Sequence, residues 1–162
     1  QRSQLWWALP LIESFKILKD IYGVSDEDYN DMLTLYKSLV DIEPLLHKPV
    51  RQMSLGQRTL SDILAAFLHN PKIVFLDEPT GGVDPVTRRQ FWELIYEAAA
   101  RGITIFVTTH YMDEAEYCNR VSIMVDGKIE ALDSPSALKR DFKTTNMNQV
   151  FHALARKATR GQ

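Results

Sequence analysis

Two adjacent carboxylates, Asp77 and Glu78, follow directly after an apolar run at residues 73–76. A short continuous apolar run is typical of a strand that is buried on both faces of a parallel sheet. Ligands of open α/β sheets bind at the carboxyl ends of the strands. Two acids at such an end can divide the work, one holding Mg²⁺ and the other activating a water molecule. The alternative is an acidic strand end that faces solvent or caps the next element.

His110 is a second candidate group, because it follows another apolar run at residues 103–107. In a parallel sheet the carboxyl ends of neighbouring strands meet at one edge, so we expect His110 to lie beside Asp77 and Glu78. Its imidazole could there contact a phosphate or orient a water molecule. A lone histidine at a strand end is also often structural, and that alternative stays open.

A third candidate is the predicted helix start at Ser54 and Gly56. A helix N-terminus offers unpaired N–H groups and the positive end of the helix dipole, and both attract phosphate oxygens. The alternative for Ser54 is a plain N-cap, which would explain the serine but not Gly56 and Gln57; Asp84, in front of Pro85, is also expected to cap a helix.

The elements that must position these residues change character along the chain. Helical spacing of apolar residues dominates up to residue 69, whereas strands and helices alternate after residue 72. The predicted helices cover residues 10–22, 26–40, 55–69, 85–100 and 111–118. Another helix is predicted to start at Pro135, and a last one to cover residues 147–160. The predicted strands cover residues 73–77, 103–107, 121–125 and 128–132, with a hairpin turn at Asp126-Gly127. We expect a βαβαβ-like layer after a helical module, and a terminal helix docked on the domain.

Composition excludes some classes of function. A chain of 162 residues with 45% hydrophobic residues can form a real core. The net charge of -2 gives no electrostatic argument for binding nucleic acid or an anionic membrane surface. The single cysteine, Cys118, cannot form an internal disulfide, which fits a reducing compartment. No apolar run approaches the roughly 20 residues that span a bilayer, so we expect a soluble or peripheral protein.

Four stretches resemble, in the same order, the motifs of ATP-binding cassette (ABC) ATPases. Residues 53–58 are similar to the signature motif LSGGQ, with Leu55 in place of a glycine. Residues 73–79 are similar to the Walker B motif, which ends in Asp-Glu-Pro. Residues 82–84 resemble the D-loop, and residues 108–110 resemble the switch-histidine loop.

The resemblance implies a fold and a division of the chain. The implied fold is α/β and P-loop NTPase-like (RecA-like), with a mostly parallel sheet that lacks its N-terminal Walker A part and an all-α helical subdomain. Residues 1–70 would form the glutamine-loop region and the helical subdomain. Residues 71–142 would form half of the RecA-like core, and residues 143–162 the C-terminal helix and tail.

The resemblance also implies roles for the acids and for His110. Glu78 would polarise the attacking water, Asp77 would hold Mg²⁺, and His110 would support the γ-phosphate of ATP. Gln1 falls where the family has its glutamine loop, so its amide would touch the magnesium ion or the water. Asp84 would also tie one active site to the other at a dimer interface.

The remaining implied site residues act across that dimer. Ser54, Leu55, Gly56 and Gln57 would close the ATP site of a second nucleotide-binding domain, with the Leu55 side chain pointing away from the nucleotide. The adjacent Trp6 and Trp7 would pack in the helical subdomain or receive part of a transmembrane partner, and one of them is expected at the surface. The acids within residues 111–116 are expected to form a solvated face.

The implied function is an ATPase subunit that drives export through a membrane permease from the cytoplasmic face of the cell membrane. A homomeric or heteromeric dimer is implied, and nucleic acid is not. The Walker A pattern G-x-x-x-x-G-K-[ST] does not occur in the sequence. We therefore expect a fragment that is inactive alone and whose sheet exposes a face or an edge. Alternatives are a non-transport ABC ATPase, acting in translation or on chromosomes, and an inactive truncated interaction module.

Overall fold

The computed structural model describes residues 4–160, with the side chains of residues 4–156. Gln1 therefore lies outside the described residues. The chain divides into two compact units, with the boundary between Thr108 and Thr109. The division into residues 1–70, 71–142 and 143–162 stays a prediction.

The first unit begins with helices that bury one face each. These are α1 (Leu11–Tyr22), α2 (Asp26–Leu39), α3 (Glu43–Leu46), the 3-10 helix η1 (Val50–Gln52) and α4 (Leu55–Phe67). Gly23 ends α1 in the left-handed conformation, and the Ser25 hydroxyl accepts the N–H of Asp28 to begin α2. Phe15 and Tyr36 meet edge to face in the core between α1 and α2. The three long predicted helices are confirmed.

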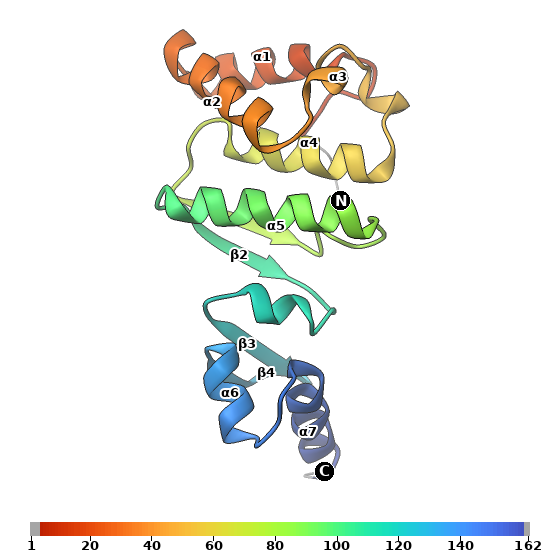
Figure 1. The fold of residues 1–162 in the computed structure, drawn as a ribbon, viewed down its shortest axis with the longest axis vertical. Coiled ribbons are helices and arrows are strands. Elements are labelled where there is room, and N and C mark those ends of the chain that lie inside the picture. The colour runs from red at the N-terminus through yellow and green to blue at the C-terminus, as the bar shows by residue number, and fades with distance from the viewer. Residues whose placement is uncertain (1–3, 161–162) are drawn as a thin grey trace. The chain divides into compact units, whose positions relative to one another are not determined.

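A parallel βαβ unit completes the first unit. Strand β1 (Ile73–Asp77) pairs with β2 (Thr104–Thr108) in parallel, and α5 (Pro85–Ala100) connects them. Helices α1 to α4 form the first layer, α5 forms the next, and the two-stranded sheet forms the last (Figure 1). Helix α5 packs its buried face, which includes Phe91, Leu94 and Ile95, between the other helices and the sheet.

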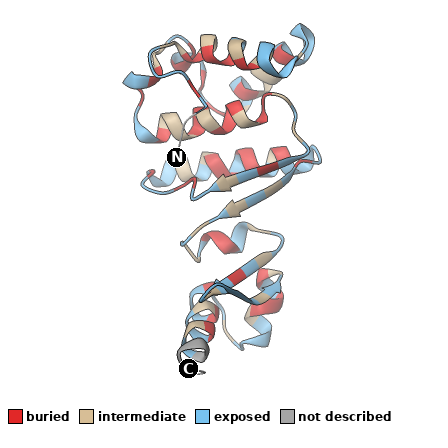
Figure 2. Cartoon of the chain, turned by 180° about the vertical axis from the view of Figure 1, so that it is seen from behind, coloured by how far each residue is buried: buried red, intermediate tan, exposed pale blue. Residues whose placement is uncertain are grey.

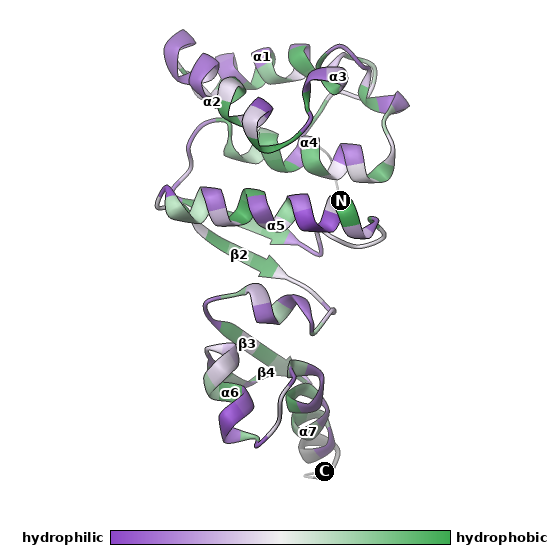
Figure 3. Cartoon of the chain, viewed as in Figure 1, coloured by the Kyte–Doolittle hydropathy of each residue, from purple (hydrophilic) through white to green (hydrophobic). Residues whose placement is uncertain are grey.

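The predicted burial of β1 on both faces is wrong. Ile73, Phe75 and Phe106 are 53%, 76% and 54% exposed, and the two phenylalanine rings stack at 5.1 Å. Successive side chains of a strand point to opposite faces, and α5 covers only one of them. The hydrophobic strands β1 and β2 (green in Figure 3) are thus less buried than α4 and α5 (Figure 2). The exposed sheet face that the sequence led us to expect is confirmed.

The second unit is built on an antiparallel hairpin. Strands β3 (Val121–Val125) and β4 (Lys128–Asp133) are joined at Asp126 and Gly127, which have φ of 49° and 76°. Two positive φ values in succession are what the tight hairpin turn requires. β3 therefore pairs with β4, and the described strands form two separate sheets rather than the βαβαβ layer. Residues 114–117 form a 3-10 helix, η2, instead of the predicted α-helix over 111–118.

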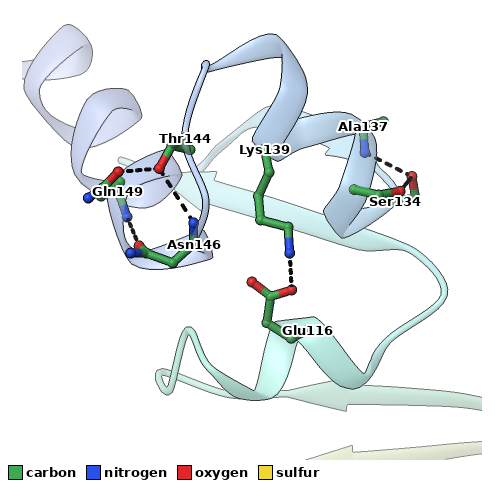
Figure 4. A network of polar contacts seen from close by, with 8 residues as sticks. Glu116, Ser134, Ala137, Lys139, Thr144, Asn146 and Gln149 are labelled. Atoms are coloured by element: carbon green, nitrogen blue, oxygen red, sulfur yellow. Dashed lines mark hydrogen bonds and ion pairs between the residues drawn. The ribbon is translucent and has the colours of Figure 1, made fainter.

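Two helices cover this hairpin. Helix α6 (Pro135–Asp141) begins at Ser134, and α7 (Met147–Arg160) follows it. Lys139 on α6 forms an ion pair with Glu116, while Thr144, Asn146 and Gln149 form a small polar network at the start of α7 (Figure 4). A common core holds the unit together and consists of Ala115, Ile123, Leu138, Met147, Val150 and Leu154. The predicted docking of the terminal helix is confirmed.

Within the described chain, no helix combines the length and the hydrophobicity that crossing a membrane requires.

Candidate functional site

The two acids stand at the end of β1, where Thr108 ties them to β2. Asp77 and Thr108 are register partners, and the Thr108 hydroxyl donates to Asp77 Oδ1 at 2.6 Å. The N–H of Glu78 donates to the Thr108 carbonyl at 3.1 Å and to its Oγ1 at 3.0 Å. One threonine hydroxyl therefore donates to the first acid and accepts from the second. Both acids are exposed at this edge of the sheet.

Glu78 has an unusual backbone conformation. Its φ is 44°, in the left-handed region that costs a residue other than glycine roughly 1–2 kcal/mol. Two hydrogen bonds to Thr108 and one from the N–H of Gly81 to the Glu78 carbonyl, at 3.2 Å, hold the turn. Backbone strain of this kind concentrates at functional sites. The turn therefore holds Glu78 in a fixed backbone conformation at the end of β1.

The start of α4 carries a complete capping box. The Gln57 N–H donates to Ser54 Oγ at 3.2 Å, and the Ser54 N–H donates to Gln57 Oε1 at 3.1 Å. Lys48 Nζ donates to the same Gln57 oxygen at 3.2 Å. The predicted N-cap role of Ser54 is confirmed, and Gln57 caps its own helix. Whether these residues act across a dimer stays a prediction.

The signature stretch and the D-loop stretch lie side by side in the first unit. A Cβ built on Gly56 would lie 2.8 Å from Thr87 Oγ1 on α5, closer than real Cβ atoms come. A Cβ on Gly82 would lie 3.2 Å from Leu55 Cδ2. The Leu55 side chain is thus packed against the turn at Gly82, and Gly56 lets α4 approach the start of α5.

Asp84 caps α5, as the sequence predicts. Its Oδ1 accepts the N–H groups of Val86 and Thr87, both at 3.0 Å, and its Oδ2 accepts the Thr87 hydroxyl at 2.6 Å. These hydrogen bonds stabilise the carboxylate and so lower the pKa of Asp84. The largest contribution comes from the Thr87 hydroxyl, the next from the Thr87 N–H, and a smaller one from the Val86 N–H. The role of Asp84 at a dimer interface stays a prediction.

His110 lies in the second unit, in a loop that is hydrogen-bonded on both sides of it. The Thr109 hydroxyl donates to Glu114 Oε2 at 2.7 Å, and the Tyr111 N–H donates to Thr109 Oγ1 at 3.0 Å. The exposed His110 ring lies 4.1 Å from the ring of Tyr111. The placement of His110 beside Asp77 and Glu78 stays a prediction, whereas the parallel pairing of β1 and β2 is confirmed.

The expectation of a solvated acidic face at residues 111–116 is wrong for Glu114, which is fully buried. Asp113 and Glu116, in contrast, are exposed. The short 3-10 turn rotates Glu114 inward, where the Thr109 hydroxyl solvates its carboxyl group. The adjacent tryptophans Trp6 and Trp7 are both partly exposed, at 39% and 57%.

Sequence reasoning missed four residues that organise the site, namely Lys48, Thr87, Thr108 and Glu114. For Thr108 a signal existed, because it opens the stretch 108–110 that resembles the switch-histidine loop. For the other three residues the contact depends on how separate elements pack, or on which way a short turn faces.

The donor chemistry at the end of β1 fits a magnesium ion. Mg²⁺ prefers oxygen ligands and usually binds through one or two carboxylates together with substrate phosphates and water. Asp77 and Thr108 supply a carboxylate and a hydroxyl at one point. No cluster of three or more His, Cys, Asp or Glu side chains that could hold a metal ion occurs among the described residues. Gln1, the other predicted ligand, lies outside the described range.

Comparisons with known proteins agree with the motifs. A family model described as "AAA domain, putative AbiEii toxin, Type IV TA system" matches residues 2–112. A solved structure described as "Structure of ATP binding subunit of ABC transporter" superposes with a TM-score of 0.81 and 27% identity, over 93% of this chain and 64% of that chain. The chain belongs to the AAA domain family as an ABC-type nucleotide-binding domain.

Relatives of this nucleotide-binding domain include two named bacterial proteins. "Probable multidrug ABC transporter ATP-binding protein YbhF" of Escherichia coli K12 is 34% identical over 139 residues, which is 86% of this chain and 24% of that protein. "Fluoroquinolones export ATP-binding protein Rv2688c" of Mycobacterium tuberculosis is 38% identical over 128 residues, which is 78% of this chain and 41% of that protein. The ABC-type domain described here thus spans about a quarter of the first relative.

The match fixes the fold class of this ABC-type domain. The P-loop NTPase-like α/β fold with a helical subdomain is confirmed by the superposition on the solved ATP-binding subunit. ATPases of this family in general bind ATP together with Mg²⁺. The chain belongs to that ATPase family.

Proposed function

We propose that this chain is part of an ABC transporter subunit that hydrolyses ATP to drive export through a membrane permease. The observation that carries the proposal is the turn at the end of β1. There Glu78 is held at a φ of 44° by Thr108, while the same threonine hydroxyl is bonded to Asp77. The M. tuberculosis relative carries fluoroquinolone export in its name, which supports the direction of transport, and the E. coli relative carries the words multidrug ABC transporter.

Each acid takes a separate role in the proposed reaction. Asp77 and Thr108 would hold Mg²⁺, which when bound neutralises charge on the phosphates of ATP. The Glu78 carboxylate would orient a water molecule toward the γ-phosphorus and accept its proton. The His110 imidazole would donate a hydrogen bond to a γ-phosphate oxygen. Catalysis then consists mainly of positioning and electrostatic stabilisation.

The capping box limits which groups of α4 could meet a phosphate. The N–H groups of Ser54 and Gln57 are used within the box. The N–H groups of Leu55 and Gly56, with the Ser54 hydroxyl proton, are therefore the donors that the γ-phosphate of a second domain would meet. Gln57 and its partner Lys48 would act by fixing this helix start rather than by touching ATP.

The partners follow from the same proposal. A second nucleotide-binding domain, identical or different, would complete each ATP site, with Asp84 at the interface. A permease would contact the partly exposed Trp6 and Trp7, of which Trp7 stacks with Arg58 on α4 at 5.1 Å. The subunit would work at the cytoplasmic face of the membrane. Gln1 would add an amide ligand to the magnesium ion or the water.

Substitution of Glu78 tests the proposal. In the full-length protein Glu78→Gln should reduce ATP turnover by about a hundredfold or more while ATP binding is kept, since the amide cannot accept the proton. Glu93→Gln is a matched control, because Glu93 is a surface acid on α5 paired with Arg89. Undiminished ATPase activity in Glu78→Gln would refute the assignment. The 162-residue chain alone should not turn over ATP, because its sequence lacks a Walker A pattern.

A further inference from the structure

Glu114 is a fully buried carboxyl group for which the proposed reaction has no direct use. Burying a carboxylate is unfavourable unless hydrogen bonds replace its hydration. Its Oε2 accepts the Thr109 hydroxyl at 2.7 Å. A surface acid on the same turn, Glu116, is paired with Lys139 instead. The burial of Glu114 therefore coincides with a specific contact to the loop that carries His110.

That contact belongs to a set of hydrogen bonds on both sides of His110. Thr109 Oγ1 accepts the Tyr111 N–H at 3.0 Å, so one hydroxyl joins the residues before and after His110. The Glu114 N–H donates to the Tyr111 carbonyl at 3.0 Å, which closes the turn from the other side. The orientation of the Thr109 hydroxyl is set by Glu114, because a hydroxyl that donates its only proton to a carboxylate leaves its lone pairs for the N–H.

We propose that Glu114 is a positioning residue that acts through Thr109 to fix the backbone at His110. The inference rests on the proposed function, in which His110 contacts the γ-phosphate. A catalytic contact depends steeply on placement, so loosening this loop should lower the rate of the chemical step more than the affinity for ATP. A merely structural acid would instead change the stability of the second unit and leave kcat of the folded protein unchanged.

Isosteric substitutions in the full-length protein separate these roles. Thr109→Val removes the hydroxyl, and we expect kcat to fall by about tenfold or more with the KM for ATP changed by less than about twofold. Thr109→Ser keeps the hydroxyl and should restore kcat to within about threefold of the wild type. Glu116→Leu is the matched control for Glu114→Leu, because Glu116 lies on the same turn at the surface.

The combination of substitutions tests whether Glu114 works through Thr109. Glu114→Leu should lower kcat in the wild-type background. In the Thr109→Val background it should lower kcat by less than about a further twofold. If Glu114→Leu does not fold, the comparison of Thr109→Val with Thr109→Ser still decides whether the Thr109 hydroxyl positions His110. An unchanged kcat in Thr109→Val, or an equal effect of Glu114→Leu in both backgrounds, overturns the inference. Loss of turnover in Glu78→Gln alongside an active Thr109→Val would refute only the positioning role.

Discussion

Gly56→Ala probes the contact that brings the signature stretch and the D-loop stretch together. The new Cβ would lie 2.8 Å from Thr87 Oγ1, 3.1 Å from its Cγ2 and 3.3 Å from its Cβ. Thr87 cannot easily rotate away, because its hydroxyl and its N–H both bond to Asp84. Either the threonine leaves Asp84 or α4 moves away from α5.

The magnitude follows from two opposing effects. Overpacking of this kind costs about 1–3 kcal/mol. Alanine is favoured over glycine in a helix by up to about 1 kcal/mol. We therefore expect Gly56→Ala to lower the free energy of unfolding by about 1 kcal/mol. Thr87→Ala removes the two nearest atoms, so the double variant should be more stable than the sum of the single effects by about 1 kcal/mol.

Urea unfolding followed by tryptophan fluorescence measures this, because Trp92 is buried on α5. Gly81→Ala is the matched control, since its Cβ would come no closer than 3.4 Å to the Glu78 carbonyl oxygen, an ordinary contact. If Gly56→Ala unfolds at the wild-type urea concentration, the predicted overpacking is refuted. The same holds if Thr87→Ala fails to lessen its effect.

Two further predictions concern hydroxyl groups and pH. The buried Tyr29 hydroxyl has no hydrogen-bond partner in the described part of the chain, and burial raises its pKa to about 12, so Tyr29→Phe should leave the melting temperature unchanged or higher. Tyr36→Phe should instead lower the free energy of unfolding, measured by heat or urea, by about 1–2 kcal/mol, because the Tyr36 hydroxyl donates to the Leu64 carbonyl at 2.7 Å. Equal effects of the two substitutions would contradict this reasoning. The pKa of Asp84 lies below its ordinary value of 3.8, so the stability from its cap is present above pH 3.8 and is lost as pH falls through the lower, folded-state pKa. In Thr87→Val, the Asp84 pKa measured by NMR should rise toward 3.8, and an unchanged value would show that the Thr87 hydroxyl is not the main cause.

Much of this protein could be predicted from the sequence because the interactions involved are local. The side-chain caps at Ser25, Ser54, Asp84 and Ser134 each bond to an N–H two or three residues away. The turn at Asp126-Gly127 needs only its own two residues to adopt positive φ. The order of the motifs, and with it the family, is likewise a property of the linear chain.

The tertiary structure decided which faces are covered and which distant groups meet. It left Phe75 and Phe106 exposed on one side of the sheet, and it rotated Glu114 into the core of the second unit. It also placed Thr87 against Gly56, and Thr108 between the two acids. The sequence of an apolar run is the same whether one or two layers cover the strand. The sequence around an acid is likewise the same whether its side chain is solvated or buried. Only the packing of neighbouring elements determines how much water each side chain keeps.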